Sequence, residues 1–328
     1  MKRRDFITAL FGTAVAVDLL PLAAQAQHKP MAVIGYLHFA NADYVPGAKE
    51  FLQGLQEKGY ADGKDVVLEF RWAEGHYDRL PALAAELVAR KVDLIVAFGP
   101  PSAHAAKMAT STIPIVFEVG NDAVEAGLVA SLSRPGGNAT GFNVLFTQVI
   151  PKLVDLLSQL IPSTKRIALL VNPNSPTAAP SIQGAQEGAR SRNVQLAIVK
   201  AANESDIDTA FASIGNLQGD GIVVSPDPFF DTRRAQLVDA AARYKIPAIY
   251  FERGFCTVGG LISYGSDLAA VYRQMGVYAG RILSAEKPAD LPVVQPTKYD
   301  LVVNLKTAKT LGIDVPQSLL VTADEVIE

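Results

Sequence analysis

Apolar residues along this chain form two alternating patterns from residue 31 onward. Short uninterrupted runs such as MAVIGYL are typical of strands that are covered on both faces of a sheet. They alternate with segments such as PGAKEFLQGLQEKGY, in which apolar residues recur at helical spacing. The predicted strands are residues 31–37, 66–73, 93–99 and 113–120, and the predicted helices are residues 46–60, 79–91 and 101–111. This order predicts a parallel, doubly wound α/β sheet.

The same pattern begins again in the second half of the chain. KRIALLVNPN corresponds to MAVIGYLHFA, DGIVVSPDPFF to VDLIVAFGPPS, and YKIPAIYFERG to STIPIVFEVGN. Three strands therefore recur in the same order and at similar intervals, which indicates an internal repeat. The sequence predicts an α/β fold with two similar doubly wound parallel-sheet lobes, joined by crossover hinges.

Two segments are candidates for the crossovers between the lobes. RPGGNATGFN, residues 134–143, is rich in glycine, which tolerates the dihedral changes of a hinge. LISYGSD, residues 261–267, is the second candidate. We assign the amphipathic helix at residues 268–288 to the first lobe and residues 290–313 to the second. The expected domains are a first lobe of residues 27–142 plus 265–288 and a second lobe of residues 143–264 plus 289–328.

The first 26 residues have the composition of an export signal. A basic KRR stretch precedes an apolar stretch at residues 6–24, and AQA at residues 24–26 has the small-x-small pattern that a signal peptidase cleaves. The arginine pair followed by DFI resembles the twin-arginine signal. A membrane anchor is the alternative, but Asp18 would be costly at a bilayer centre. We expect residues 1–26 to be a cleaved twin-arginine-like signal, and the mature protein to lie in the periplasm.

Composition and charge exclude several classes of function. Of the 328 residues, 49% are hydrophobic and 19% are charged, as in packed globular proteins. The net charge of −3 gives no electrostatic reason to expect nucleic acid as a partner. The single cysteine, Cys256, excludes an intramolecular disulfide. The sequence has no GxSxG, GxxxxGK[ST] or GxGxxG motif and no metal-binding histidine spacing, so we expect no catalytic residue, no metal and no cofactor.

The loops after the predicted strands are the expected binding region, because parallel α/β sheets bind ligands outside the carboxyl ends of their strands. These loops are residues 38–44, 99–103, 118–123, 172–178, 225–230 and 251–255. They are rich in Asn, Ser, Asp and aromatic residues, which suits a small polar molecule with an apolar portion. If the lobes face one another, the loops line one cleft. The predicted ligand-binding residues are Ser102, Asn121, Asp122, Asn143, Asn172, Asn174, Asp227, Phe229, Glu252 and Asp267.

Several of these candidates also have a purely structural explanation. Ser102, Asp122 and Asp267 stand where helix N-caps are expected. The N–H groups beside Ser102 could equally hold a carboxylate of the ligand. Asn172 and Asn174 flank a proline, so turn formation alone could explain both.

The candidates of the second lobe leave similar alternatives open. Asp227 is fixed between two prolines, and Phe229 offers either a stacking face or a buried core ring. Glu252 could pair with the adjacent Arg253 or receive the ammonium group of a ligand. His38, at the end of the first strand, is not assigned to the site, because a lone histidine there more often has no special role.

Long stretches of the chain carry a resemblance to a known family. RWAEGHYDRLPALAAELV, RPGGNATGFN, LVNPNSP and the late YGSD before a helix resemble the ABC transporter substrate-binding proteins of the tryptophan/tyrosine-binding type, over nearly the whole length. The resemblance implies a type I periplasmic-binding-protein fold. It also implies a receptor that closes over a small ligand and delivers it to an inner-membrane ABC permease and ATPase. It places ligand contacts at Ser102, Asp122, Asn172 and Asp267.

We interpret the chain as a monomeric periplasmic receptor of an ABC importer. The expected ligand is an aromatic or other amino acid or a related small carboxylate, with its ammonium group on Asp122 or Glu252. A periplasmic ligand sensor for a membrane signalling receptor is the alternative, since the same fold serves both roles. An exported hydrolase that uses carboxylates in the cleft is less favoured, because these residues have no catalytic spacing.

Overall fold

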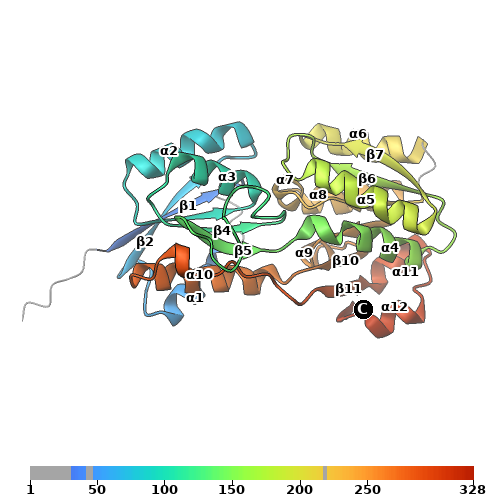
Figure 1. Cartoon of the computed structure of the whole chain (residues 1–328). Helices are drawn as coiled ribbons and strands as arrows, with labels where there is room; N and C mark the ends of the chain where they lie inside the picture. The colour runs from blue at the N-terminus through green and yellow to red at the C-terminus, as the bar shows by residue number, and fades with distance from the viewer. Residues whose placement is uncertain (1–30, 42–46, 217–219) are drawn as a thin grey trace, which may run out of the picture. The chain divides into compact units, whose positions relative to one another are not determined.

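The computed structural model describes residues 31–41, 47–216 and 220–328, and residues 31–328 form one compact unit. The predicted export signal and part of the loop at residues 38–44 lie outside the described residues. Two sheets organise the described chain, each with helices packed on both faces (Figure 1). The fold is therefore the predicted pair of doubly wound lobes.

The first sheet has five strands in the order β2-β1-β3-β4-β5, and every pair is parallel. The strands are β1 (Ala32–His38), β2 (Val66–Trp72), β3 (Leu94–Phe98), β4 (Ile115–Val119) and β5 (Ala139–Asn143). β3 and β4 are buried along their whole length, as their continuous apolar runs predict. Helices α1 (Ala48–Glu57) and α10 (Leu268–Leu283) pack together on one face, and α2 (Leu80–Ala89) and α3 (Pro100–Ala109) on the other (Figure 1).

The second sheet repeats this order and extends it. Its strands β7-β6-β8-β9-β10 correspond in order to β2-β1-β3-β4-β5, which confirms the internal repeat. The strands are β6 (Arg166–Val171), β7 (Gln195–Lys200), β8 (Gly221–Val224), β9 (Ala248–Tyr250), β10 (Ile262–Gly265), β11 (Asp300–Asn304) and β12 (Glu325–Ile327). β11 pairs antiparallel with β10, whereas the other pairs of this sheet are parallel. The chain re-enters here without a crossover helix on this sheet, and it can therefore run in the opposite direction.

The helices of the second lobe cover its sheet in pairs, α4 with α5 and α6 with α8. The helices are α4 (Ile150–Leu160), α5 (Ala178–Arg192), α6 (Glu204–Asn216), α7 (Pro228–Thr232), α8 (Arg234–Tyr244), α9 (Gly254–Thr257), α11 (Leu305–Leu311) and α12 (Gln317–Thr322). Three short 3₁₀ helices are η1 (Tyr77–Arg79), η2 (Phe146–Val149) and η3 (Pro288–Asp290). Of all these elements, the 3₁₀ helix η1 and the α-helix α7 matter most for function, because they carry residues of the site described below.

The segments predicted as crossovers are largely strands. Residues 134–143 contain β5, and residues 261–267 contain β10. The chain instead changes sheets after β5, after β10 and between α10 and β11. Gly141 is required for packing rather than for a hinge, because a Cβ there would overlap the backbone of Phe117 in β4. The lobe boundaries at residues 142, 264 and 288 stay predictions.

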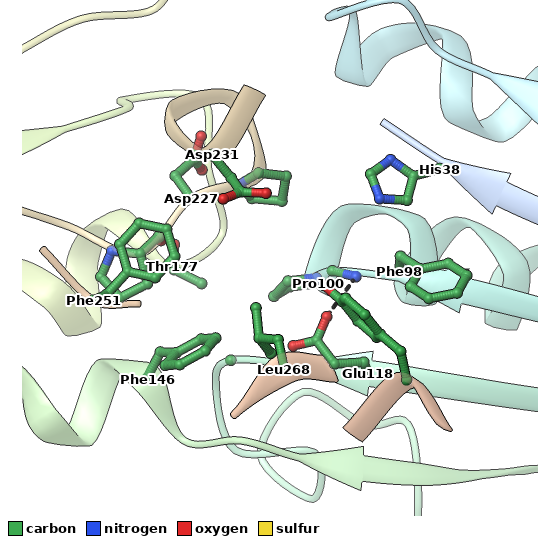
Figure 2. Close-up of a pocket in the computed structure, with 15 residues that line it drawn as sticks. His38, Phe98, Pro100, Glu118, Phe146, Thr177, Asp227, Asp231, Phe251 and Leu268 are labelled. Atoms are coloured by element: carbon green, nitrogen blue, oxygen red, sulfur yellow. Dashed lines mark hydrogen bonds between the residues drawn. The ribbon is translucent and has the colours of Figure 1, made fainter. Parts of the chain in front are cut away.

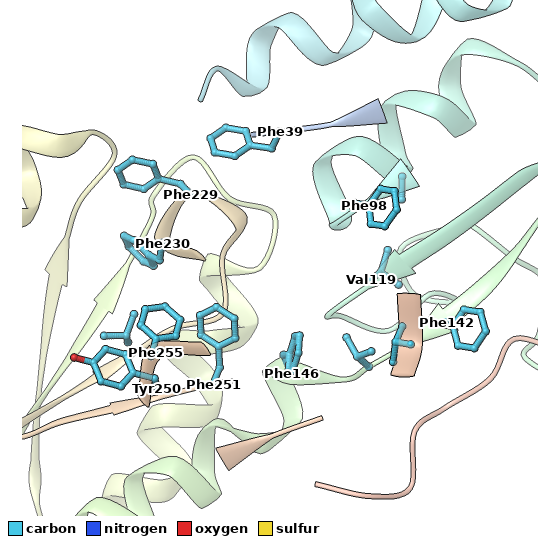
Figure 3. Packing of buried hydrophobic residues seen from close by; sticks show 14 of the residues in the cluster. Phe39, Phe98, Val119, Phe142, Phe146, Phe229, Phe230, Tyr250, Phe251 and Phe255 are labelled. Atoms are coloured by element: carbon cyan, nitrogen blue, oxygen red, sulfur yellow. The ribbon is translucent and has the colours of Figure 1, made fainter. Parts of the chain in front are cut away.

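Aromatic side chains connect the core of the second lobe to its carboxyl edge (Figure 3). Tyr250 stacks on Phe255 with ring centroids 4.5 Å apart, and Phe251 meets Phe255 edge-on at 5.3 Å. Phe146, from η2, then contacts Phe251 at 5.5 Å. Such packed rings fix one another's orientation. The outermost of them form part of the wall of a cavity.

Candidate functional site

A cavity lies between the carboxyl ends of the strands of both sheets (Figure 2). The first lobe contributes His38 at the end of β1, Gly99 after β3 and Glu118 in β4, and the second lobe contributes Thr177 and Asp227. The other lining residues are Phe98, Pro100, Gly120, Phe146, Pro226, Pro228, Asp231, Phe251, Leu268 and Tyr272. The cavity volume is about 60 Å³, room for about four to six water molecules. This is a site for a small molecule rather than a polymer.

The topology of the two sheets explains why the cavity forms here. In each sheet the chain order reverses beside the central strand, between β1 and β3 in the first sheet and between β6 and β8 in the second. The loops that follow these strands turn to opposite faces of the sheet and leave a crevice between them. The cavity lies at both reversal points at once, because its walls come from the ends of β1 and β3 and from the loops after β6 and β8.

Glu118 is a buried carboxyl on the first-lobe wall, with 7% of its surface exposed. The Gly99 N–H donates to its Oε2 at 3.2 Å, while Oε1 has no hydrogen-bond partner among the described residues. Figure 2 shows its carboxylate directed toward the space between the two walls. The pKa of Glu118 is raised to about 7, mainly by burial; the hydrogen bond from the Gly99 N–H lowers it in part, and the negative charge of Asp231 adds to the increase. This carboxyl can therefore gain or lose its proton near neutral pH.

His38 is a neutral hydrogen-bond donor that lines the same cavity as Glu118. Its Nδ1 accepts the Ala40 N–H at 2.9 Å, so the proton of the neutral ring is on Nε2. Burial lowers the pKa of His38 to about 3. The ring packs against Phe98, with centroids 5.4 Å apart. His38 thus supplies an N–H to the cavity without a positive charge.

Asp227 is the centre of a hydrogen-bond network on the second-lobe wall. It caps α7 by accepting the Phe229 N–H at 3.0 Å, and it accepts the Asn172 Nδ2–H at 3.1 Å. The Tyr77 hydroxyl lies 2.9 Å from both carboxylate oxygens. Burial raises the pKa of Asp227, while hydrogen bonds from Ser175 and these three groups lower it. Since Tyr77 comes from η1 of the first lobe, Asp227 also joins the two lobes.

A second charged group lies behind Asp227. Arg234 binds both Asp231 and Glu252, the latter at 2.9 Å. The pKa of Glu252 is raised to about 7, mainly by burial and also by the negative charge of Asp231, while Arg234 acts in the opposite direction. Of the two alternatives left open for Glu252, pairing with Arg253 is not the one found, because Glu252 is buried and binds Arg234 whereas Arg253 binds Glu325 at 2.6 Å. The charge of Arg234 is therefore already shared between two carboxylates.

The remaining walls of the cavity are apolar. Phe146 and Phe251 meet edge-on at 5.5 Å on the second-lobe side, and Phe98 meets Tyr272 at 5.3 Å on the first-lobe side. Leu268, at the start of α10, completes this surface. A ligand in the cavity therefore contacts aromatic rings on two sides, which favours a molecule with an apolar body.

The predicted binding residues separate into three groups. Asp227 lines the cavity, and Asn172 supports it through their hydrogen bond. Asn172 also accepts the Asn174 N–H at 3.0 Å, which is the turn that the sequence predicts as the alternative. Phe229 belongs to the buried core, with Arg233 above its ring at 6.0 Å. Glu252 stands behind the cavity, next to Arg234.

A second group lies at grooves outside this cavity. Asn121 and Asn174 line one groove, and Asn121 and Asp122 line another. Asp122 accepts the Val124 N–H at 2.7 Å and the Glu125 N–H at 3.0 Å. The helix expected after Asp122 is absent, because residues 123–127 form a turn instead, so its role as a helix cap was wrong.

The third group consists of Ser102, Asp267 and Asn143, which lie within or next to a helix or strand. The predicted capping role of Ser102 was wrong: α3 begins at Pro100 with Gly99 as its N-cap, and Ser102 lies in the first turn with no hydrogen-bond partner for Oγ among the described residues. Asp267 does cap α10, accepting the Ala270 N–H at 3.2 Å. Asn143 is fully buried at the end of β5, and neither amide atom has a partner within the described chain.

The cavity residues that were not predicted from the sequence form two groups. His38, Glu118 and Thr177 lie within the predicted loops, so their region was predicted but not their inward orientation. Phe146 and Tyr272 come from η2 and α10, which follow the changes between sheets. Only the fold brings these elements to the carboxyl edges.

Within residues 31–41, 47–216 and 220–328, no three His, Cys, Asp or Glu side chains converge as metal ligands. In the same described ranges, no helix combines the length and the apolar character that a bilayer crossing requires.

Two lobes of equal strand order, with a cavity at the carboxyl edges of both, define a two-lobed small-molecule-binding protein of the type I periplasmic-binding fold. The family model described as ABC transporter substrate binding protein matches residues 40–327. The chain belongs to this family, whose members bind small molecules and work with ABC transporter components.

Similar proteins include one curated relative and several solved structures. A tyrosine-binding protein of Clostridioides difficile (strain R20291) is 30% identical over 264 residues, which are 80% of this chain and 75% of that protein. A conserved domain protein from Vibrio cholerae has a TM-score of 0.83 at 28% identity, covering 90% of this chain and 99% of the other.

Two further structures represent different ligand states. The ABC domain from Streptococcus pneumonia in complex with L-Trp has a TM-score of 0.80 at 26% identity, over 90% of this chain and 100% of the other. The ligand-free, open structure of a substrate-binding protein with adhesive properties from Clostridium difficile has a TM-score of 0.63 at 25% identity, over 90% and 99%.

Proposed function

We propose that the protein is the periplasmic receptor of an ABC importer. It encloses a small organic molecule in the cavity between its lobes and delivers it, as a monomer, to an inner-membrane permease and ATPase. The observation that carries this proposal is the cavity at the reversal points of both sheets, with polar groups from both lobes. One relative is named a tyrosine-binding protein and another is a complex with L-Trp. Aromatic amino acids are therefore the first ligands to test.

Closure of the lobes is part of this proposal. At nearly equal identity, the structure resembles the L-Trp complex more than the ligand-free open structure. This supports a closed arrangement in which Tyr77 of the first lobe contacts Asp227 of the second, and Gly99 contacts Pro228. The lobes would separate about hinges near residues 142, 264 and 288. Opening then exposes the cavity for ligand entry, and binding shifts the population toward closure.

The polar ligand contacts proposed here are His38, Glu118, Thr177 and Asp227. All four line the cavity and are largely buried, so each acts in a region of low dielectric where hydrogen bonds are strong. Asn172 positions Asp227 through their hydrogen bond. The rings of Phe146 and Phe251 would contact the apolar part of the ligand.

Substitution of Gly99 tests the proposal directly. Gly99 has a φ of 79°, and a Cβ there would meet the Pro228 ring at 2.8 Å across the lobes. Gly99→Ala should therefore oppose closure and weaken ligand binding by about tenfold or more, a loss of about 1.4 kcal/mol. The measurement is isothermal titration of the mature chain with the small molecule that mass spectrometry finds after denaturation.

Gly127→Ala is the matched control. Gly127 also has a positive φ, 70°, but no atom lies within 4 Å of the position of its Cβ. Gly127→Ala also places a side chain at a positive φ but makes no contact across the lobes, so it should not lower the affinity. Equal affinity in both variants, or the absence of any bound small molecule, would contradict the proposal. The importer role is tested by uptake of that molecule in a deletion strain; unchanged uptake with a lost signalling response would favour a sensor.

A further inference from the structure

The polar groups of the cavity are acids and neutral donors. Glu118, Asp227 and Asp231 supply three carboxyl groups, whereas none of the described lining residues is Lys or Arg. The nearest arginine in this network, Arg234, already binds Asp231 and Glu252. His38 is neutral because burial lowers its pKa to about 3. The site therefore has no cationic side chain to neutralise the carboxylate of a ligand.

The helix N-termini at the cavity do not replace such a cation. An anion can bind a helix N-terminus only through free backbone N–H groups. α3 begins with two prolines, which have none. α10 already carries the capping carboxylate of Asp267. At α5, the N–H groups of Thr177 and Ala178 donate to Ser175 at 3.3 and 3.1 Å. The two prolines of α3, the Asp267 carboxylate at α10 and Ser175 at α5 thus reduce the donors that these N-termini can offer to an anion.

Glu118 points independently to a ligand of opposite charge. It is 93% buried, since 7% of its surface is exposed, and its Oε1 has no hydrogen-bond partner among the described residues. A buried carboxyl with an unused oxygen facing a cavity is destabilising unless a donor fills the space. The donor must come from the ligand, and a charged donor gives the stronger bond.

We propose that the ligand is a small organic cation without a carboxylate, a protonated amine whose N–H groups donate to Glu118 and whose apolar body lies against Phe146 and Phe251. A zwitterionic amino acid would place its carboxylate among Glu118, Asp227 and Asp231, where like charges repel. This inference rests on the proposed function and specifies its ligand. It differs from the ligands named for the relatives, tyrosine and L-Trp.

Amine binding should then depend on pH. The other titratable groups that line the cavity with Glu118 are His38 from β1, Asp227 and Asp231 from the second lobe and Tyr272 from α10. Burial raises the pKa of Glu118 to about 7, so this carboxyl is mostly protonated at pH 6 and mostly charged at pH 8. A primary aliphatic amine stays protonated over this range. Affinity should therefore rise about tenfold from pH 6 to pH 8.

Matched pairs of ligands test the proposal in the wild-type mature chain. Tyramine and tyrosine, tryptamine and tryptophan, and isobutylamine and valine differ only in the carboxylate. Isothermal titration at pH 8 should give each amine that binds at least tenfold higher affinity than its amino acid. 3-(4-Hydroxyphenyl)propionate, which has the carboxylate without the amine, should bind more weakly than tyramine. Three pairs of different size ensure that the result does not depend on the volume of one ligand.

Two variants test whether Glu118 causes the preference for amines. Glu118→Gln keeps the shape of the side chain but removes its charge, so amine affinity should fall at least tenfold and its dependence on pH should disappear. Glu286→Gln is the control, because Glu286 pairs with Arg281 at the protein surface and outside the cavity. It should bind amines like the wild type. Equal affinities in the two variants would overturn the role of Glu118.

The outcomes separate this inference from the proposed function. If amino acids bind as well as or better than their amines, the proposal of a cationic ligand is wrong, while the proposed receptor function is unaffected. Failure of every amine to bind would also overturn the cation. If the purified protein releases a molecule that carries a carboxylate, the proposed receptor function is supported and the proposal of a cationic ligand is contradicted. If no molecule is released and no compound of either class binds, both the receptor function and the cationic ligand are contradicted.

Discussion

The two walls of the cavity each present a buried carboxyl, yet the two groups are held very differently. Glu118 in the first lobe accepts one hydrogen bond, from Gly99, and its second oxygen faces the cavity. Asp227 in the second lobe accepts hydrogen bonds from Tyr77, Asn172 and the Phe229 N–H. Burial raises the pKa of both, and in Asp227 the hydrogen bonds offset part of the effect.

The difference indicates separate tasks for two groups of the same chemistry. Asp227 accepts several hydrogen bonds from the protein, and one of its partners belongs to the other lobe, which suits holding the lobes together in addition to contacting the ligand. Glu118 keeps an oxygen available, which suits a role in contacting the ligand. A buried carboxyl can thus be fixed or available according to the donors around it.

The largest expected effect concerns the proton of Glu118. The folded protein holds this proton up to a pKa of about 7, whereas the unfolded chain releases it near 4.5. Glu118 therefore stabilises the fold fully below pH 4.5 and loses this contribution as the pH rises through 7. Between pH 5 and pH 8, the free energy of unfolding of the ligand-free wild type should fall by about 2 to 3 kcal/mol relative to Glu118→Gln.

Urea unfolding of both proteins at pH 5, 6, 7 and 8 measures this effect. The difference between the two proteins isolates Glu118, because burial also raises the pKa of Asp227 and Glu252 in each of them. If the two free energies of unfolding changed in parallel with pH, Glu118 would not have a raised pKa. The contrast with Asp227 would then rest on hydrogen bonding alone.

An intermediate effect is expected at the contact between the lobes. Tyr77→Phe removes the hydroxyl that bonds both oxygens of Asp227, a loss of about 1 to 3 kcal/mol for a bond of this kind. Because the bond joins the lobes, the loss should weaken ligand binding by about tenfold and leave the unfolding of the ligand-free protein nearly unchanged.

The control for Tyr77→Phe is a second tyrosine with one hydrogen bond. Tyr278 donates to the Pro292 carbonyl at 2.9 Å, away from the cavity. Tyr278→Phe should lower the free energy of unfolding by about 1 kcal/mol without changing ligand affinity. The reverse pattern, with Tyr77→Phe altering unfolding alone, would mean that the Tyr77–Asp227 bond does not depend on closure.

The same two carboxyls illustrate how far the sequence predicts the site. Asp227 lies between two prolines at the end of an apolar run, so its position at a strand end is encoded locally. Glu118 sits inside the run IPIVFEVG and reads as one polar residue of a buried strand. Its access to the cavity depends on the Gly99 N–H from β3 and on α7 of the other lobe, contacts that local sequence does not specify.

In the fold, too, features set by local sequence were predicted, whereas features set by contacts between distant segments were not. Apolar runs and the threefold match between halves predicted the strands and the common strand order, because burial on both faces leaves a local pattern. The antiparallel pairing of β11 depends on where the chain returns from α10, which no local pattern records. The turn at residues 123–127 likewise stands where a helix was expected after Asp122.

The smallest effect is expected at Asp267, a carboxylate that is exposed rather than buried and that caps α10 through the Ala270 N–H. Asp267→Ala should lower the free energy of unfolding by about 1 kcal/mol, whereas Asp267→Asn, which keeps a capping oxygen, should stay close to the wild type. Neither should change ligand affinity, because Asp267 does not line the cavity. A tenfold loss of affinity in both variants would instead make Asp267 a ligand contact, as the family resemblance implies. The carboxylates that matter for binding would then not be restricted to the buried pair, since a helix cap at the rim would act with them.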